Sequence, residues 1–526
     1  MRPIRFTAAL LGLLAATAAL ATPPDPPNMR FSGAFNRRLD FVWQSVPRVN
    51  WYELWQRPND GAPWVKFATL PSGRVGVGSY VSTHLLNWEQ VRYQLKACNP
   101  SGCGASAELD AFDDRALSAM IYIKPSRAQA GAKFGSAIDL SEDAHTLVSV
   151  SRSETDVQSG RQSIVNIYLF TDTSADRNWR QQARLFPSVT QPNNGEGVVA
   201  NLSGNGSVLI VGIPAERANA SATAPEIGAA YVFRRTGSTW SRERRFTPPP
   251  GMTPAHYGFA AEISEDGNTI MIGRETDGGT AEVYKYADGV WTLAATVPGP
   301  GGRMGCNRIR LSGDGQTVAR TCSIPPFVME LHVFRGPSYA LEFEDNIFGT
   351  DEAPLRDFAI DYRGITFLYS GVGSQRHVGY TRWENGVATR NVHLTPYWSC
   401  HDDNIAVSEY GGRVAISRDG QFFAVRDIRD TCGGTGPIPF SALYPGNKPT
   451  GAVYVYQVRD DGGGRFRIIK PNVPPPEGGW FEGELSFADN GHALAISQPG
   501  DRSGATDPYH SQTDTSKPDA GGVLIY

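Results

Sequence analysis

One short pattern recurs along most of this 526-residue chain. It consists of an alternating apolar strand, a turn of the Ser-x-Asp-Gly kind and a second apolar strand, and a clear copy is YGFAAEISEDGNTIMIG at 257–273. Two further strand-length runs follow this copy, AEVYKY at 281–286 and a run opened by Trp291. Four such runs separated by Gly/Asp turns predict a four-stranded antiparallel meander, which cannot bury both of its faces alone.

The pattern occurs seven times, and this repetition predicts how the faces are covered. The other copies are FGSAIDLSEDAHTLVSV (134–150), GVVANLSGNGSVLIVG (197–212), CNRIRLSGDGQTVART (306–321), RDFAIDYRGITFLYS (356–370), GGRVAISRDGQFFAVR (411–426) and FEGELSFADNGHALAIS (481–497). The aligned turn residues are Ser141, Ser203, Ser264, Ser312, Asp361, Ser417 and Ala488. A four-stranded unit repeated in this way predicts an all-β fold with a seven-bladed β-propeller over residues 115–526.

The first and last strand-like runs of this region are expected to complete one blade together. The run AMIYIK at 119–124 is the only strand-like run before the first copy, and GVLIY at 522–526 supplies a third strand to the last copy. Pairing between them would close the ring and remove two open sheet edges.

Residues 1–21 have the pattern of a signal peptide. Arg2 and Arg5 precede an apolar run that ends at Ala19-Leu20-Ala21, a small-x-small cleavage site. A membrane anchor is the alternative, but the run is short of the ~20 residues that a helical span needs. We therefore expect a protein without a membrane span that is secreted, periplasmic or held at the cell surface.

Residues 22–112 form a separate strand-rich region that begins with several prolines. It carries Trp43, Tyr52 within WYELWQR, and Tyr93 a few residues before Ala97-Cys98-Asn99. These residues resemble a bacterial fibronectin type III module. The resemblance implies a β-sandwich in which Trp43 fills the core and Tyr93 forms the tyrosine corner. It also implies a spacer or adhesive role, although the Arg-Gly-Asp sequence of integrin ligands is not present.

The repeats of the larger region resemble bacterial FG-GAP repeats, relatives of the integrin α-subunit propeller. Phe134-Gly135-Ser136 and Tyr257-Gly258 match the first half of the motif, and Val211-Gly212-Ile213-Pro214 matches the second. Integrin repeats bind calcium through an acid-rich loop between these halves. Here the turns are tight and carry a lone acid such as Asp266, whereas calcium needs six to eight oxygen ligands. We predict no calcium, no other metal and no cofactor.

Six cysteines in an exported chain predict three disulfides. Sequence alone allows other connectivities, but spacing favours three local pairs. These are Cys98–Cys103, Cys306–Cys322 and Cys400–Cys432.

Composition and motifs exclude several functional classes. A net charge of −4 gives no general attraction for nucleic acid or anionic membranes. No nucleophile elbow, phosphate-binding loop or dinucleotide fingerprint occurs. His401-Asp402-Asp403 could ligate a metal but is more simply a solvated loop. Trp179, Trp240 and Trp291 each open a fourth strand, and their spacing favours packing between blades over a ligand-stacking platform.

The predicted binding surface comes from loop lengths. The connection between second and third strands is long in blades six, seven and two and intermediate in blade one, and these blades are neighbours in a closed ring. Long loops on a rigid scaffold commonly carry recognition. Their polar residues are Glu216, Arg217, Asn219, Arg429, Asp430, Asp501, Arg502, Asp507, Tyr509 and His510.

Two functions remain open. The first is a monomeric secreted or cell-surface binding protein whose partner is an extracellular protein or glycan. The second is an extracellular polysaccharide hydrolase that draws its acids from the long loops. Propellers host both, but the missing catalytic motif and the repeat type favour binding over catalysis.

Overall fold

The computed structural model describes most of the chain from Thr22 to Tyr526. The described ranges are 22–35, 38–58, 61–80, 91–110, 121–155, 165–172, 179–186, 197–219, 221, 223–251, 256–275, 279–299, 305–324, 328–348, 352–373, 378–384, 387–394, 410–428, 451–458, 465–469, 483–504 and 516–526. The predicted signal peptide, 1–21, lies outside them. The chain divides into a smaller N-terminal unit and a larger unit that includes Ala111–Tyr526, and we describe each by itself.

The N-terminal part contains two sheets. One has the order β1-β2-β5, with β1 at Arg30–Phe35, β2 at Arg38–Val42 and β5 at Gly76–Tyr80. The other has the order β4-β3-β6-β7, with β4 at Val65–Pro71, β3 at Trp51–Arg57, β6 at Arg92–Asn99, β7 at Gly102–Ala105 and β8 (Leu109–Asp110) paired to β6.

An aromatic core lies between these strands. Phe41 and Tyr93 are fully buried, with ring centroids 5.0 Å apart, and Trp43 packs on Tyr52 at 5.3 Å. Trp43 is therefore a core residue, as the sequence predicts.

Tyr93 does not make the hydrogen bond of the predicted tyrosine corner. The buried hydroxyl of Tyr93 makes no hydrogen bond within the described residues. The hydroxyl of Tyr52 instead accepts the backbone N–H of Val46 at 3.0 Å, six residues upstream. Tyr93 is surrounded by the rings of Phe31, Phe41 and Phe67, which offer no acceptor.

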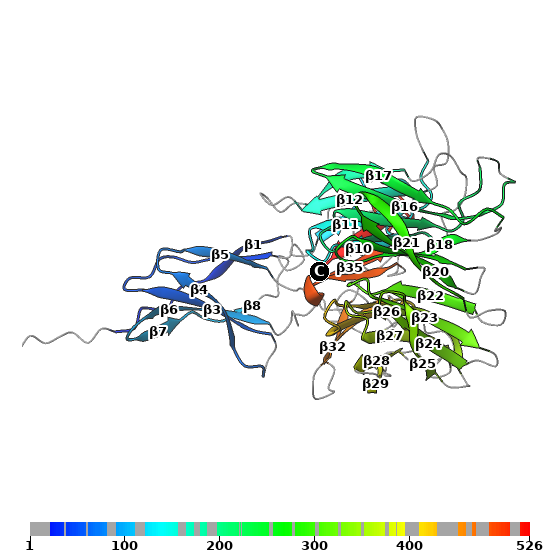
Figure 1. Ribbon diagram of the computed structural model, residues 1–526. Helices are drawn as coiled ribbons and strands as arrows, with labels where there is room; N and C mark the ends of the chain where they lie inside the picture. The colour runs from blue at the N-terminus through cyan, green and yellow to red at the C-terminus, as the bar shows by residue number, and fades with distance from the viewer. Residues whose placement is uncertain are drawn as a thin grey trace, which may run out of the picture. The chain divides into compact units, whose positions relative to one another are not determined.

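The larger unit consists of four-stranded antiparallel sheets that follow one another around an axis (Figure 1). We number the seven sheets of the described residues in chain order, each with its strands from the axis outward. Sheet 1 holds β10 (Ala137–Leu140), β11 (Thr146–Ser151), β12 (Asn166–Asp172) and β13 (Trp179–Leu185). Sheet 2 holds β14 (Val199–Leu202), β15 (Val208–Ile213), β16 (Ala229–Thr236) and β17 (Thr239–Phe246). Sheet 3 holds β18 (Tyr257–Ile263), β19 (Thr269–Arg274), β20 (Thr280–Ala287) and β21 (Val290–Val297).

The remaining sheets have the same order. Sheet 4 holds β22 (Gly305–Leu311), β23 (Thr317–Ile324), β24 (Val328–Arg335) and β25 (Ala340–Phe348). Sheet 5 holds β26 (Glu352–Ile360), β27 (Thr366–Gly373), β28 (Val378–Glu384) and β29 (Val387–Leu394). Sheet 6 holds β30 (Val414–Ile416), β31 (Phe422–Asp427), β32 (Ala452–Gln457) and β33 (Arg465–Ile469). Sheet 7 holds β34 (Leu485–Ala488), the short helix η4 (Asp489–Gly491), β35 (Ala493–Gln498), β36 (Gly522–Ile525) and β9 (Ile121–Ile123).

The first strands close into a ring, which makes this unit a β-propeller. Each first strand contacts the first strand of the next sheet, and β34 of sheet 7 contacts β10 of sheet 1. The strand that precedes all of these first strands, β9, pairs with β36 in the register Val523↔Ile123 and Ile525↔Ile121. The predicted closure of the last sheet by the run near residue 121 is thus confirmed.

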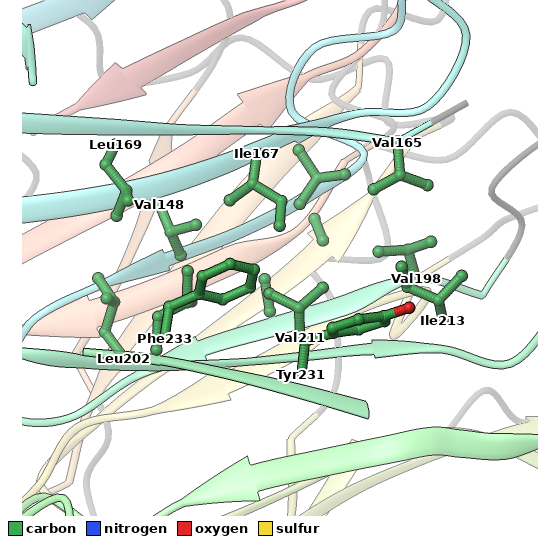
Figure 2. Close-up of a cluster of buried hydrophobic side chains, with 14 of the residues drawn as sticks. Val148, Val165, Ile167, Leu169, Val198, Leu202, Val211, Ile213, Tyr231 and Phe233 are labelled. Atoms are coloured by element: carbon green, nitrogen blue, oxygen red, sulfur yellow. The ribbon is translucent and has the colours of Figure 1, made fainter. Parts of the chain in front are cut away.

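Neighbouring sheets are held together by apolar side chains between their faces. Figure 2 shows one such layer, in which Val148, Ile167 and Leu169 of sheet 1 lie over Val211 and Phe233 of sheet 2. Trp240 joins this layer and donates its Nε1–H to Gln182 of sheet 1 at 2.8 Å. Trp291 packs in the same way between sheets 3 and 2. Packing between sheets is therefore the role of these tryptophans, as their spacing predicts.

The repeated turn is a small hydrogen-bond network. In sheet 3, Ser264 Oγ donates to Asp266 and accepts the backbone N–H of Thr269 at 2.9 Å, while Asp266 also accepts the N–H of Asn268. The corresponding serine bonds recur in sheets 1, 2, 4 and 6. The residue two positions after each serine, an aspartate in sheets 1, 3, 4 and 6 and Asn205 in sheet 2, is thus engaged within the turn, which explains why this residue pair recurs in the sequence.

The turns also bond to one another around the axis. Gly204 donates its N–H to the carbonyl of Glu265 at 2.8 Å, Glu265 donates to Gly313 at 2.8 Å, and Tyr362 donates to Arg418 at 3.1 Å. Sheet 7 joins sheet 1 in the same way, from Asp489 to Glu142 at 2.8 Å. We call these bonded turns the turn ring. The bonds join the turns of neighbouring sheets from sheet 7 to sheet 1 and on through sheet 6.

Two of the three predicted disulfides lie in described residues and are confirmed. Cys98 bonds to Cys103, and Cys306 bonds to Cys322 across the β22–β23 hairpin, where the two residues are register partners. The third predicted pair, Cys400–Cys432, lies outside the described residues. Disulfides persist in oxidising compartments such as the periplasm or the cell exterior.

Candidate functional site

A cavity of 310 Å³ lies on the axis of the propeller. Residues from the first strand of every sheet line it. Because side chains alternate along a strand, residues two and four positions before each turn residue face the axis at two levels roughly 7 Å apart. We call these levels the turn-proximal and the turn-distal layer.

The residues of the two layers vary from sheet to sheet. In the order of sheets 1 to 7, the turn-proximal layer is Asp139, Asn201, Glu262, Arg310, Ala359, Ala415 and Ser486. In the same order, the turn-distal layer is Ala137, Val199, Ala260, Arg308, Asp357, Arg413 and Glu484. Charge therefore concentrates on sheets 4 to 7 of the turn-distal layer, whereas sheets 1 to 3 contribute small apolar side chains there.

Arg310 and Asp357 connect the charged residues of the two layers. Arg310 Nη1 lies 3.3 Å from Glu262, and its Nη2 lies 3.4 Å from Asp357 Oδ1. Arg308 Nε approaches the same carboxylate oxygen at 3.4 Å, and the other oxygen of Asp357 accepts the N–H of Val414 at 3.0 Å. One buried carboxylate thus serves two guanidinium groups.

A second pair completes the charged arc. Arg413 Nε donates to both carboxylate oxygens of Glu484, at 2.7 and 2.8 Å. The nearby carboxylate raises the pKa of Arg413 further above its ordinary value. Burial, together with Arg310 and Arg413, lowers the pKa of Arg308, although Asp357 and Glu484 oppose this effect.

Two carboxyl groups of the turn-proximal layer have raised pKa values. Burial raises the pKa of Asp139 to about 6, although its oxygens accept hydrogen bonds from Leu202 and Ser486. Burial raises the pKa of Glu262 to about 7, against the lowering effect of Arg310. Near neutral pH the Glu262 carboxyl can therefore hold or release a proton.

Side chains from the turn ring close one end of the axis. Arg418 of sheet 6 reaches Glu265 of sheet 3 at 2.7 Å, although these sheets are not neighbours, and its guanidinium stacks on Tyr362 at 4.0 Å. On the other side of the axis, Glu142 of sheet 1 accepts the N–H of Asn490 of sheet 7 at 2.8 Å. These contacts place polar side chains across the turn-ring end of the axis.

The predicted loop residues of blade two lie in described residues. Glu216 is buried and accepts the hydroxyl of Tyr231 at 2.6 Å and the guanidinium of Arg245. Arg217 pairs with Glu226 at 3.5 Å, and the side-chain oxygen of Asn219 accepts the N–H of Ser221. Glu216 is thus held by its own sheet, whereas Arg217 is half-buried and Asn219 is exposed.

The predicted loop residues of blade seven fall partly in described residues. Asp501 accepts the hydroxyl of Tyr122 at 2.6 Å and the ammonium group of Lys124 at 3.0 Å, so it holds the segment that contains β9. Arg502 is half-buried beside it. The other predicted residues, Arg429, Asp430, Asp507, Tyr509 and His510, lie outside the described residues, as does His401-Asp402-Asp403.

The cavity residues were not predicted from the sequence, although a signal for them exists. Alignment of the seven copies on their turn residue places the polar series Asp139, Asn201, Glu262 and Arg310 in one register, within strands that are otherwise apolar. A polar residue at the same inward position of successive repeats indicates a polar axis.

Two wider properties of the described residues bear on the site. No helix among them is long and apolar enough to cross a membrane. One group of potential metal-binding residues lies close together, Glu53, Cys98 and Cys103, but the two cysteines form a disulfide and offer no thiolate.

Comparison with known proteins returns β-propeller structures. No family model matches the chain, and no curated protein matches it. The C-terminal WD40 domain of Sif2 is 10% identical with a TM-score of 0.42, covering 77% of this chain and 98% of that one. The periplasmic gluconolactonase of Pseudomonas aeruginosa is 12% identical with a TM-score of 0.41, covering 81% and 100%. Sqt1 of Saccharomyces cerevisiae is 11% identical with a TM-score of 0.41, covering 72% and 83%.

Proposed function

We propose that this chain is an exported binding protein that recognises a glycan at one face of a seven-bladed propeller. In this proposal residues 1–21 are the signal peptide, 22–112 are a fibronectin type III spacer, and 115–526 are an FG-GAP-type propeller. The partner is extracellular, and the chain acts as a monomer. An extracellular protein is the other partner that the long loops would suit.

The observation that carries the proposal is the composition of the axial cavity. Arg308, Arg310 and Arg413, which carry donors, and Asp139 and Glu262, which carry acceptors, line one cavity. Sugars present both hydroxyl donors and hydroxyl acceptors, and a small number of placed polar groups fixes their orientation in a pocket. The paired charges keep the cavity near neutrality, which suits a polyhydroxylated ligand better than a highly charged one.

The predicted loops and the end of the cavity away from the turn ring belong to the same face. In each sheet the first strand ends at the turn ring, so the second strand returns to the opposite face and begins its connection to the third strand there. The connections that carry Arg217, Asn219 and Arg502 therefore belong to the face opposite the turn ring. We infer that a ligand would contact both the loops and the cavity.

A glycan array with the purified chain, followed by calorimetry on each hit, tests the proposal. Replacing residues 505–515 by a short Gly-Ser linker removes much of the blade-seven loop and leaves the Asp501 contacts with Tyr122 and Lys124 in place. We expect weaker binding and an unchanged melting temperature. Binding that survives this change and is lost on deleting residues 22–112 would place recognition in the N-terminal module instead.

Hydrolysis of a polysaccharide is the second candidate function. It is favoured by one observation, which is that Asp139 and Glu262 line the same cavity with pKa values raised to about 6 and about 7. A carboxyl that stays protonated near neutrality can serve as a general acid, and a second carboxylate can serve as base or nucleophile. Release of reducing sugar from an array hit, abolished in Glu262→Gln, would establish this function, whereas binding without release would exclude it for that ligand.

A further inference from the structure

The strand β3 of the N-terminal unit carries large apolar side chains on both of its faces. Tyr52 and Leu54 are fully buried and face the core. Trp51, Glu53 and Trp55 alternate with them and are half-buried on the other face. A strand with one solvated face normally carries polar side chains there. The two outer tryptophans therefore need an explanation other than packing in the core.

The strands on either side of β3 add two lysines to this outer face. Lys96 of β6 is the register partner of Glu53, and Lys66 of β4 is the register partner of Trp55. Register partners in an antiparallel pair point to the same side of the sheet. We call the surface formed by Trp51, Glu53, Trp55, Lys66 and Lys96 the tryptophan face.

Glu53 fixes the orientation of both indole rings. Its carboxylate accepts the Nε1–H of Trp51 at 3.3 Å and the Nε1–H of Trp55 at 3.1 Å, and Lys66 Nζ donates to it at 3.1 Å. Although partial burial opposes the effect, these hydrogen bonds hold the pKa of Glu53 below its ordinary value. The carboxylate therefore stays ionised at neutral pH, and one acceptor holds both rings in place before a ligand arrives.

The charges of the tryptophan face do not balance. Glu53 is its one carboxylate, and Lys66 forms an ion pair with it. Lys96 is half-buried, its Nζ lies 4.0 Å from the ring centroid of Trp55, and it makes no ion pair with a described residue. The face thus carries two positive charges against one negative charge, which complements an anionic ligand.

Trp51 extends the surface along the strand. Its indole is half-buried and, among the described residues, contacts no other aromatic ring and no cation. Trp51 and Trp55 are four residues apart on one strand, so their Cα atoms are about 13 Å apart. This span is longer than one sugar ring, so the tryptophan face suits an extended oligosaccharide rather than a single terminal sugar.

We propose that the tryptophan face binds an extended acidic glycan, whose sugar rings stack on Trp51 and Trp55 and whose carboxylates contact Lys66 and Lys96. The C–H face of a pyranose ring is apolar and packs on an indole, and a uronate supplies the negative charge that the two lysines attract. This inference goes beyond the proposed function, which gives residues 22–112 the role of a spacer and places recognition on the propeller.

A glycan fits this surface better than an acidic peptide does. Two flat rings held at a fixed spacing match a polymer of repeated rings, and an acidic peptide offers the charge without the rings. The peptide is therefore one of the probes in the experiment below.

Calorimetry of the purified chain with trigalacturonate, trigalactose and triglutamate tests the inference. We expect trigalacturonate to bind about tenfold more tightly than either other probe, because it alone carries both rings and charges. Trp51→Ala should weaken trigalacturonate binding by about ten- to hundredfold, as for a tryptophan at the centre of a binding surface. Lys96→Gln should weaken it by about three- to tenfold at about 0.02 M salt, and this difference should vanish at about 0.5 M salt, where charges are screened.

Matched variants in the larger unit separate a local site from a general effect. Lys285 is likewise a half-buried lysine on a strand, and Phe186 is an exposed aromatic residue with the guanidinium of Arg184 at 5.0 Å from its ring. Lys285→Gln and Phe186→Ala should leave trigalacturonate binding unchanged. If Trp51→Ala does not fold, Trp51→Phe and the salt comparison for Lys96→Gln give the same decision.

The outcomes separate this inference from the proposed function. Absence of trigalacturonate binding, or binding that neither Trp51→Ala nor Lys96→Gln weakens, overturns the inference and leaves the propeller site to the glycan array. Equal binding of trigalactose overturns the acidic sugar, and triglutamate that binds as tightly overturns the sugar class. Trigalacturonate binding that is lost on replacing residues 505–515 and kept in Trp51→Ala assigns the glycan to the propeller loops and also overturns the inference.

Discussion

The two ends of the propeller axis are built from the same repeated strands, yet they differ in how much the repeats agree. At the turn ring, Ser141, Ser203, Ser264, Ser312 and Ser417 make the same bonds in five sheets. Two residues earlier the chain has Asp139, Asn201, Glu262, Arg310 and Ala415. The repeats therefore share the same residues at the turns that hold the ring together and differ at the positions that line the cavity. Any ligand binding or catalysis at the axis would depend on these variable positions.

Opening the ring of sheets should cause the largest loss of stability. Deleting Gly522–Tyr526 removes β36 and with it the buried side chains of Val523, Leu524 and Ile525. Each buried aliphatic contributes about 1.5–3 kcal/mol, so the loss is on the order of the whole stability of a domain. We expect no cooperative thermal unfolding of the propeller by circular dichroism. Replacement of residues 505–515 is the control deletion, and equal melting temperatures for the two variants would contradict the role of β36.

A methyl group in the turn ring should have the next largest effect. Gly267 has a φ of +72°, and a Cβ there would lie 3.0 Å from Val208 of the neighbouring sheet. Gly289 has a φ of +81° with no atom within 4 Å of such a Cβ. Both substitutions to alanine carry the backbone cost of about 1–2 kcal/mol, and Gly267→Ala should lose about 1–3 kcal/mol more by crowding the next turn. Denaturant unfolding that finds equal losses would show that the turns do not pack on one another.

The variable positions that line the cavity should make the free energy of unfolding depend on pH. The pKa of Glu262 is raised from its ordinary value of 4.5 to about 7, so the folded protein binds this proton more tightly than the unfolded chain. The resulting stabilisation is complete below about pH 4.5 and is lost as pH rises through 7. Glu262→Gln removes this loss, on the order of 1–2 kcal/mol, from the free energy of unfolding between pH 5 and 8. A wild-type and variant difference that stays constant over this range would contradict the raised pKa.

The smallest effect is expected for the pair that crosses the axis. The side chains of Arg418 and Glu265 are 37% and 25% exposed, so water screens their interaction. A double-mutant cycle with Arg418→Ala and Glu265→Ala should give a coupling of about 0.2–1 kcal/mol. A larger coupling would mean that this pair, rather than the backbone bonds between turns, holds the turn ring.

Much of the fold could be predicted from local sequence, whereas the cavity on the propeller axis could not. The Ser-x-Asp-Gly turns and the runs near residues 121 and 524 are recognisable because turn chemistry and strand alternation act over a few residues. The cavity was not predicted because Asp139 and Glu262 resemble the solvent-facing positions of half-buried strands. Only the ring turns those positions toward a common axis.

Residue roles that depend on long-range partners were the weakest part of the sequence analysis. The sequence assigned the tyrosine corner to Tyr93, but its hydroxyl makes no hydrogen bond among the described residues, and the hydroxyl of Tyr52 accepts the backbone N–H of Val46. Glu216 and Asp501 were assigned to a binding surface, but Arg245, Tyr122 and Lys124, which are distant in sequence from them, engage their carboxylates.

The pairing of β9 with β36 also determines the order in which the propeller can mature. During synthesis, β9 leaves the ribosome before β10, the first strand of sheet 1. Its partner β36 emerges only after sheets 1 to 6 and the first two strands of sheet 7 have been translated. Until then β9 lacks this partner and β35 has an open edge, which another chain could occupy. A chain that crosses a membrane as it is made would therefore rely on chaperones longest at sheet 7, and a translation stop shortly before Gly522 would release a product prone to pair with its own copies.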